Sequence, residues 1–164
     1  MEVIIGDLTR ICERNLLPNN VKATVREPYI PFIPEHWNGV LILAEAQNHG
    51  KAVKLRDGTL FLDWLMSLSS IKRMQRLYHN PDYPKLGNIG IQPWDDGTLK
   101  IAVEAALNIN ADETAVSNAC LWSAPSEELK ECSVRVWTDM LKILKPKKIV
   151  TAGSIANEII VRAR

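Results

Sequence analysis

Polar side chains suited to chemistry follow directly after the apolar run at 39–44. This run is rich in leucine and β-branched residues, which is typical of a strand buried on both faces. Glu45, Asn48 and His49 come next. A carboxylate can position a water, and an amide and an imidazole can donate hydrogen bonds. The sequence therefore predicts one wall of an active site at 44–50, although each of these side chains fits a polar loop tip equally well.

Two later stretches repeat this pattern of a strand followed by polar residues. The second strand, expected at 114–120, carries Asn118 near its end, and the third, expected at 148–152, leads into Gly153 and Ser154. Ser154 is expected to cap the next helix, and a helix start of this kind can hold a phosphate. The carboxyl ends of parallel strands lie along one edge of a sheet, where open α/β folds place their ligand sites. We therefore expect these residues to lie near the first wall.

Helices alternate with these strands. Apolar residues recur at helical spacing, and start and stop signals bound them, with Ser126 as the N-cap of the longest helix and Pro146 after its end. The expected helices span 2–16, 60–78, 99–107, 127–145 and 155–162. Prolines at 21–36 predict an extended surface segment, since proline cannot donate to a strand ladder. This order predicts the α/β class, as a three-layer αβα sandwich with a parallel central sheet.

Several side chains of these helices allow two interpretations. Cys12 lies on the apolar stripe of the first helix, where a small buried hydrophobe is a simpler explanation than a metal ligand. Lys72, Arg73 and Arg76 form a charged helix face that is expected to be solvated. The loop-like stretch at 79–98 is unusually long for a compact domain, and such loops are often functional.

Composition places the chain among ordinary globular proteins. Its 164 residues suit one domain, with 46% apolar residues, 24% charged residues and a formal net charge of +1. This charge neither requires nor excludes a polyanionic partner, and no obligate protein partner is evident. No apolar run is long enough for a membrane span, and the acidic amino terminus lacks the pattern of an export signal. Three cysteines without a CxxC pair predict a reduced, cytoplasmic protein.

Three segments together are similar to the motifs of one enzyme family. The stretch 44–48, AEAQN, is similar to a GEAPG-type first motif, and its extension to Gly50 is similar to the GQDPYHG motif of the best-known branch. The stretch 144–156, LKPKKIVTAGSIA, is similar to the family pattern l-x-P-k-x-i-v-x-l-G-x-x-A. Asn118 matches the asparagine that ends the second strand. The chain thus resembles the uracil-DNA glycosylase superfamily, and it lies closest to the iron–sulfur branch.

This resemblance implies a DNA-repair enzyme that hydrolyses the bond between uracil, or a related damaged base, and its sugar. Such an enzyme extrudes the nucleotide from the duplex and reads the edge of the base, a role that the resemblance assigns to Asn118. The resemblance implies catalytic roles for Glu45, Asn48 and His49. Glu45 would either position the attacking water or organise the backbone, and the other two would donate hydrogen bonds.

DNA contacts follow from the same resemblance. Gly153 and Ser154, which open a helix, would hold a phosphate of the DNA. An aromatic ring would stack on the flipped base, and the candidates in the matching interval are Phe61, Tyr83 and Trp94. We expect Trp94 to be the ring that stacks on the base, because it lies in the unusual proline-rich loop, although ordinary packing would explain this residue equally well.

The iron–sulfur branch holds its cluster with four cysteines. The matching positions in this chain are Cys12, Asn15, Trp122 and Cys132. Two cysteines cannot hold that cluster, so the sequence predicts no cofactor and no metal. Cys120 is then expected to be an ordinary buried residue.

Other departures leave a second function open. Ala46 stands where the most active branches carry an acidic residue or asparagine, and the chain reaches Arg164 before an HPS-type loop that the family places after a further strand. We expect one domain over 1–164 that is truncated at its carboxyl end. The alternative to a glycosylase is a member of the fold without the chemistry, which binds nucleic acid or a small ligand. An unrelated α/β protein is a third interpretation.

Overall fold

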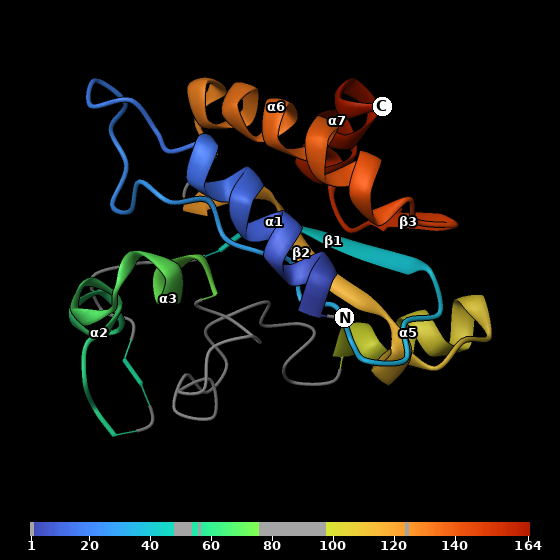
Figure 1. Ribbon diagram of the computed structural model, residues 1–164. Coiled ribbons are helices and arrows are strands. Elements are labelled where there is room, and N and C mark those ends of the chain that lie inside the picture. The colour runs from blue at the N-terminus through green and yellow to red at the C-terminus, as the bar shows by residue number, and fades with distance from the viewer. Residues whose placement is uncertain (1, 48–53, 56, 76–97, 124) are drawn as a thin grey trace.

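A parallel three-stranded sheet organises the described part of the protein (Figure 1). The structure is a computed structural model, and it describes residues 2–47, 54–55, 57–75, 98–123 and 125–164. β1 (Val40–Gln47) lies between β2 (Ala115–Ser123) and β3 (Lys148–Thr151) and pairs in parallel with both. The predicted α/β class and parallel sheet are therefore confirmed.

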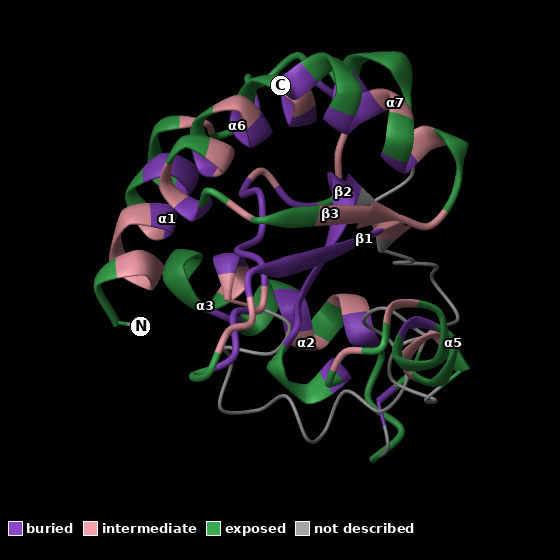
Figure 2. Ribbon diagram, turned by 90° about the vertical axis from the view of Figure 1, so that its right-hand side faces the viewer, coloured by how far each residue is buried: buried purple, intermediate pink, exposed green. Residues whose placement is uncertain are grey.

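Helices lie on both sides of the sheet (Figure 2). One side carries α1 (Glu2–Arg14), α6 (Glu127–Leu144) and α7 (Ser154–Ala163), and the other carries α2 (Phe61–Ser67), α3 (Ser70–Met74) and α5 (Thr98–Leu107). A short 3-10 helix, η2 (Ala111–Glu113), leads into β2. None of the helices in these described ranges combines the length and the apolar character needed to cross a membrane.

Alternation along β1 divides the core between the two faces. Leu41 and Leu43 belong to the large apolar cluster beneath α1, α6 and α7, whereas Val40 and Ile42 pack with Val103 of α5. Successive side chains of a strand point to opposite faces, so a strand covered on both sides is apolar at every position. This explains why the unbroken apolar run predicts a strand buried on both faces.

The proline-containing segment before β1 is buried, which corrects the prediction of a surface segment at 21–36. Tyr29 is 0% exposed and Ile30 is 1% exposed. Phe32 forms an antiparallel bridge to Val116 at the outer edge of β2, through backbone hydrogen bonds of 2.9 and 3.0 Å. The segment thus covers a sheet edge that would otherwise expose unpaired backbone groups. Proline content alone does not distinguish such a buried cover from a surface loop.

The single helix predicted at 60–78 is wrong, because α2 and α3 are separate. Leu68 and Ser69 have extended backbone angles, and the Ser69 side chain caps α3. Serine at this position is a helix-start signal that the apolar periodicity obscures. The cap predicted for α6 is confirmed, since the Ser126 hydroxyl accepts a hydrogen bond from the Leu129 N–H at 3.3 Å.

Arg73 of α3 is paired, which corrects the prediction that this charged face is wholly solvated. Its guanidinium donates to both carboxylate oxygens of Glu27, at 2.8 and 3.1 Å. The Ser70 hydroxyl donates to the same carboxylate at 2.7 Å, and Glu27 is only 6% exposed. The bidentate pair therefore fastens the buried proline segment to α3. Arg76 lies outside the described residues.

Candidate functional site

The three strands end along one edge of the sheet, next to the wall predicted at 44–50. Ala44 is the register partner of Asn118 in β2, and Leu43 is the partner of Thr151 in β3. Because these pairings are parallel, the chain leaves all three strands on the same side of the sheet. Asn118 and Ala44 nevertheless lie within their strands, since β2 continues to Ser123 and β1 to Gln47. The structure therefore places Asn118 beside the start of the predicted wall, and it corrects the prediction that Asn118 stands near the end of its strand.

Asn118 is a buried polar residue of β2. It is 1% exposed, and its Nδ2 atom has no hydrogen-bond partner among the described residues. Its register partner Ala44 packs with Val116 on the α5 side of the sheet, so strand alternation places the Asn118 amide on that side. Buried polar groups are nearly always hydrogen-bonded, and this unpaired donor therefore requires an explanation.

Tyr29 holds the backbone of Asn118, and nothing in the sequence indicated this role. The Asn118 N–H donates to the Tyr29 hydroxyl at 2.9 Å. The two residues are 89 positions apart in the chain, and a tyrosine within a proline-rich stretch carries no local signal of its partner. Only the path of the proline segment along β2 brings the hydroxyl to this N–H.

Glu45 lies against the turn that follows β3. Gly153 has a φ of +105°, and a Cβ atom added there would come within 2.7 Å of the Glu45 Cγ and closer still to Oε1. The carboxyl group therefore occupies the space that the absent side chain leaves at the start of α7, where the helix dipole favours an acid. The predicted cap by Ser154 is wrong: Gly153 takes the N-cap position, and no described side chain caps this helix.

We expect Gly153→Ala to lower the free energy of unfolding by about 2 kcal/mol, through backbone strain and collision with Glu45. Gly58→Ala is the matched control, because Gly58 has a φ of +87° but no atom of the described residues lies within 4 Å of its added Cβ. That control should show the strain alone, about 1 kcal/mol. Urea unfolding measures both, and Glu45→Ala should bring Gly153→Ala close to the control. Equal losses in the two glycine variants would contradict the contact.

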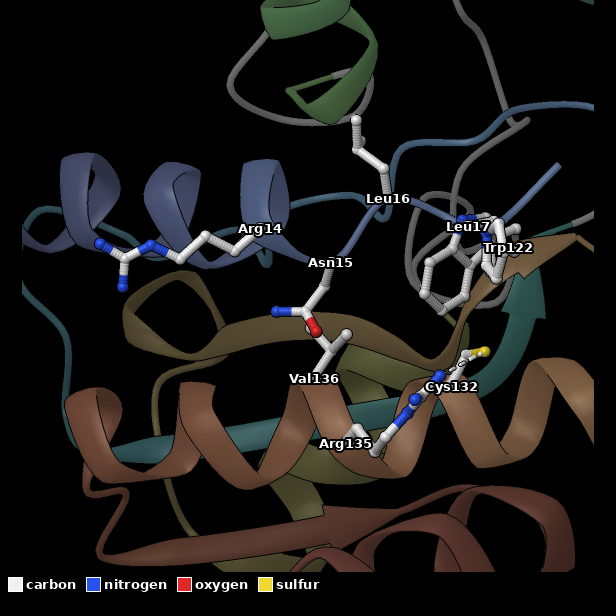
Figure 3. A pocket seen from close by; sticks show the side chains of 9 residues that line it. Arg14, Asn15, Leu16, Leu17, Trp122, Cys132, Arg135 and Val136 are labelled. Carbon is white, nitrogen blue, oxygen red and sulfur yellow. Dashed lines mark hydrogen bonds between the residues drawn. The ribbon is translucent and has the colours of Figure 1, made fainter.

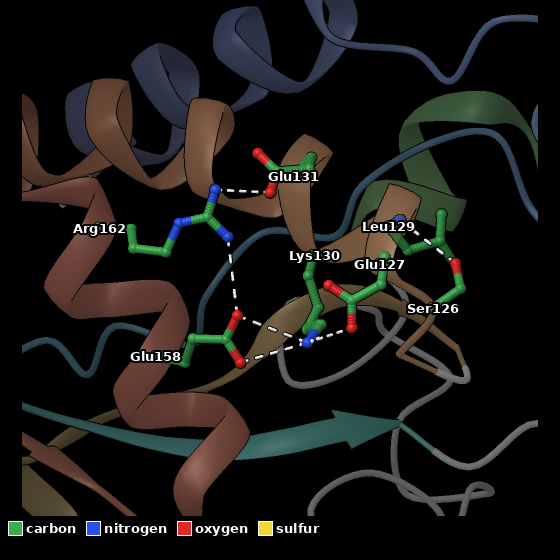
Figure 4. Close-up of polar contacts among 7 residues, drawn as sticks. All are labelled: Ser126, Glu127, Leu129, Lys130, Glu131, Glu158 and Arg162. Atoms are coloured by element: carbon green, nitrogen blue, oxygen red, sulfur yellow. Dashed lines mark hydrogen bonds and ion pairs between the residues drawn. The ribbon is translucent and has the colours of Figure 1, made fainter.

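Ion pairs hold α7 against α6 (Figure 4). The Lys130 ammonium of α6 lies 2.6 Å from Glu127 and 3.2 Å from Glu158 of α7. Hydrogen bonds to Glu127 and then Glu158 raise the pKa of Lys130. Arg162 extends the network to Glu131 and Glu158. The network joins α7 to α6, whereas buried Ala156, Ile159 and Ile160 pack α7 against the sheet.

Three of the predicted site residues, Asn48, His49 and Trp94, lie outside the described residues. The same holds for Tyr83, one of the other aromatic candidates for stacking on a base. Phe61, the third candidate, is 0% exposed and stacks on Trp64 with ring centres 5.6 Å apart. Phe61 therefore packs in a core cluster and presents no open ring face to a base.

A cavity of about 160 Å³ lies between the end of α1 and α6 (Figure 3). Its walls include Asn15, Trp122 and Cys132, three of the four positions that the resemblance matches to cluster cysteines. The fourth, Cys12, is buried in the adjoining core. Among the described residues that line the cavity, Cys132 alone carries a thiol, and its Sγ accepts a hydrogen bond from Arg135 Nη2 at 3.1 Å. These donors do not fit an iron–sulfur cluster.

The remaining cysteines behave as core residues. Cys12 and Cys120 are each 0% exposed, as predicted for small apolar side chains. Burial raises the pKa of the Cys120 thiol, which disfavours the reactive thiolate. Within the described ranges, no group of three or more His, Cys, Asp or Glu residues is arranged to hold a metal ion.

The sheet can therefore offer a buried amide from β2 on the α5 side and a carboxyl group from β1 on the α7 side. The amide can donate to a carbonyl oxygen, and the carboxyl group can order the turn that it contacts. No protein-family model matches this chain, and neither a curated protein nor a solved structure matches it.

Proposed function

We propose that this protein is a DNA glycosylase-like hydrolase that acts on uracil, or a related damaged base, flipped out of DNA. The observation that carries the proposal is the buried amide of Asn118, whose Nδ2 atom has no partner among the described residues. Asn118 stands where the family resemblance requires the asparagine that reads the base. An unsatisfied donor is expected at that position if the acceptor it lacks is a carbonyl oxygen of the substrate.

Uracil offers the hydrogen-bonding pattern that this amide can match. Its carbonyl oxygens accept hydrogen bonds and its imide N–H donates one, so Nδ2 and Oδ1 of Asn118 can pair with neighbouring groups of the base. Cytosine carries an amino donor and a ring-nitrogen acceptor at the corresponding places, which the same amide orientation cannot satisfy. The base must leave the stack to be read in this way, because its edge is out of reach inside a duplex.

The positions of distant segments support the finer assignment of a uracil-DNA glycosylase-like αβα sandwich. The first motif begins on β1, between Asn118 of β2, which is in register with Ala44, and the end of β3, where Thr151 is in register with Leu43. Asn15, Trp122 and Cys132 line a single cavity, as positions related to one cluster site would. Any parallel α/β sheet would bring the strand ends together, so the shared cavity is the more specific of the two groupings.

We assign Glu45 the backbone-organising role. Its carboxyl group packs against Gly153 at the start of α7, and no hydrogen bond joins it to Asn118 among the described residues. A DNA phosphate held by Gly153 and Ser154 would lie beside this carboxylate, and like charges at one helix start repel. Packing against Glu45 is therefore a more favourable role for this turn than binding of a DNA phosphate.

The same geometry favours a second candidate, a base-binding module without hydrolysis. The acidic residue of the most active branches is Ala46 here. Glu45 is directed toward α7, whereas the Asn118 amide lies on the α5 side of the sheet. The proposed hydrolysis therefore depends on Asn48 and His49, both outside the described residues, to act on the base and the attacking water.

Oligonucleotides with a single uracil separate the two candidates. Single- and double-stranded forms are incubated with the protein and treated with alkali, which cleaves abasic sites, and the same sequences with thymine serve as controls. We expect cleavage of the uracil strand alone. Preferential binding of uracil-containing DNA without abasic sites would favour the binding module. If the protein neither cleaves uracil-containing DNA nor binds it preferentially, both candidates are overturned.

A further inference from the structure

We infer that Tyr29 is the positioning residue of the base-reading site: its hydroxyl holds the backbone of Asn118 and thereby sets the direction of the amide. This role rests on the proposed function, because it concerns the residue that would read the base. The contact itself is independent of any substrate. The Asn118 N–H donates to the Tyr29 hydroxyl at 2.9 Å, and the two residues are 1% and 0% exposed.

The outer edge of β2 shows why a side chain is needed at this point. Val116 and Asn118 are two residues apart, so their backbone groups face the same edge. At Val116 the proline segment supplies a backbone partner, Phe32, through two hydrogen bonds. Two residues further along, the next partner in register would be Ile30. The Ile30 N–H instead donates to the Met74 carbonyl oxygen at 2.7 Å, so the segment has turned away from β2.

The Tyr29 side chain takes the place of a strand where the proline segment leaves β2. Pro28 and Pro31 flank it in the sequence, and proline lacks the N–H that a regular ladder needs. A phenol oxygen accepts a backbone hydrogen bond as a carbonyl does, and the ring has few conformations to lose on burial. On its other side, Asn118 is in register with Ala44 of β1. The strand at Asn118 therefore has β1 on one side and a phenol on the other.

A second buried hydroxyl that accepts a hydrogen bond from the same strand provides a matched control. The Ser133 hydroxyl of α6 accepts a hydrogen bond from the Leu121 N–H at 3.1 Å, and Ser133 is 0% exposed. Tyr29→Phe and Ser133→Ala each remove one hydroxyl that accepts from a buried N–H of β2. Only the first of these contacts reaches the residue that carries the amide, so the comparison separates positioning of the site from support of the strand.

Amide exchange in the ligand-free protein, followed by NMR, tests the contact. Tyr29→Phe should speed exchange of the Asn118 N–H about tenfold or more relative to that of Leu121, since an N–H without an acceptor opens more readily. It should also shift the side-chain amide resonances of Asn118. Ser133→Ala should give the reverse pattern of exchange. Unchanged exchange and unchanged Asn118 resonances in Tyr29→Phe would overturn this role, whatever the protein binds.

Discrimination between bases tests positioning. The measurement is the ratio of affinities for one oligonucleotide carrying either uracil or cytosine, which does not depend on the fraction of folded protein. We expect Tyr29→Phe to lower the uracil preference about tenfold, since a displacement of about 1 Å in a site can cost as much as 10²-fold. Ser133→Ala should keep the preference of the wild type.

The outcomes distinguish this role from the proposed function. A wild-type preference for uracil that Tyr29→Phe leaves intact would overturn the positioning role and leave the proposed function standing. If the wild type itself has no preference for uracil, the proposed function fails. Amide exchange at Asn118 then decides by itself whether Tyr29 holds this residue.

Discussion

Asn118→Ala is expected to lower kcat/KM on uracil-containing DNA by about 10²- to 10³-fold while leaving stability almost unchanged. Activity falls because the amide is the proposed reader of the base. Stability holds because the free protein buries a donor that has no partner among the described residues. An unsatisfied buried donor is unfavourable by about 1–3 kcal/mol, and its removal offsets the loss of the packing that the side chain provides.

Two measurements on each variant test this expectation. Abasic-site formation under single-turnover conditions gives the rate, and urea unfolding gives the free energy. Val116→Ala is the opposing control, since Val116 is 0% exposed on the same face of β2. It should lose about 2 kcal/mol of stability and keep its activity per folded molecule.

Either half of the expectation for Asn118→Ala can fail separately. Full activity would refute the base-reading role of the amide. A stability loss above about 3 kcal/mol would mean that the amide is already satisfied in the folded protein, and that its burial serves the fold rather than a ligand. Loss of activity at unchanged stability is the pattern expected of a group that is retained for binding at the expense of stability.

Glu27→Ala is expected to lower the free energy of unfolding by about 3 kcal/mol, because it leaves the Arg73 guanidinium in a mostly buried place without its carboxylate. The side chains of Glu27 and Arg73 are 8% and 20% exposed. Asp139→Ala breaks the pair with Lys142, whose side chains are 50% and 69% exposed, and should cost less than about 1 kcal/mol. Urea unfolding near pH 7 compares the two, and equal losses would contradict the prediction.

The pH dependence of stability tests the same pair. Burial raises the pKa of Glu27, but hydrogen bonds from Arg73 and Ser70 together outweigh it and leave the pKa below its ordinary value of 4.5. A carboxyl group of this kind contributes stability that is present above its unfolded-state pKa and is lost as the pH falls through its folded-state pKa. The advantage of wild type over Glu27→Gln should therefore shrink as the pH drops below about 4.5.

A constant difference between wild type and Glu27→Gln from about pH 7 to pH 3 would contradict this linkage. The result also bears on the site. Glu27 anchors the segment that carries Tyr29 two residues later, so the same substitution should loosen the hydroxyl that holds Asn118. Amide exchange at Asn118 measures that effect directly.

Features that depend on a few neighbouring residues could be predicted from the sequence. The apolar run at 39–44 indicated a strand covered on both faces, and β1 is that strand. Ser126 before two acidic residues indicated the start of α6, and its hydroxyl caps that helix. The alternation of helices and strands indicated a parallel sheet, and the three described strands are parallel. Periodicity, capping and strand direction are local properties, and the sequence carries them directly.

Features that join distant parts of the chain required the tertiary structure. No pattern of residues indicated that Glu45 would pack on Gly153 or that Arg73 would reach Glu27. The charged side chains of Glu45 and Arg73 could equally well extend into water. The proline segment is buried because it covers the outer edge of β2, and its prolines alone do not indicate this.

Asn118 shows the division most clearly. The sequence by itself determined that an amide stands on a strand of the sheet, and the resemblance suggested what it would read. The tertiary structure decided that this amide is buried without a described partner for its Nδ2 and that a phenol from 89 residues away holds its backbone. Burial and pairing depend on which surfaces meet when the chain folds, and no local pattern of residues records that.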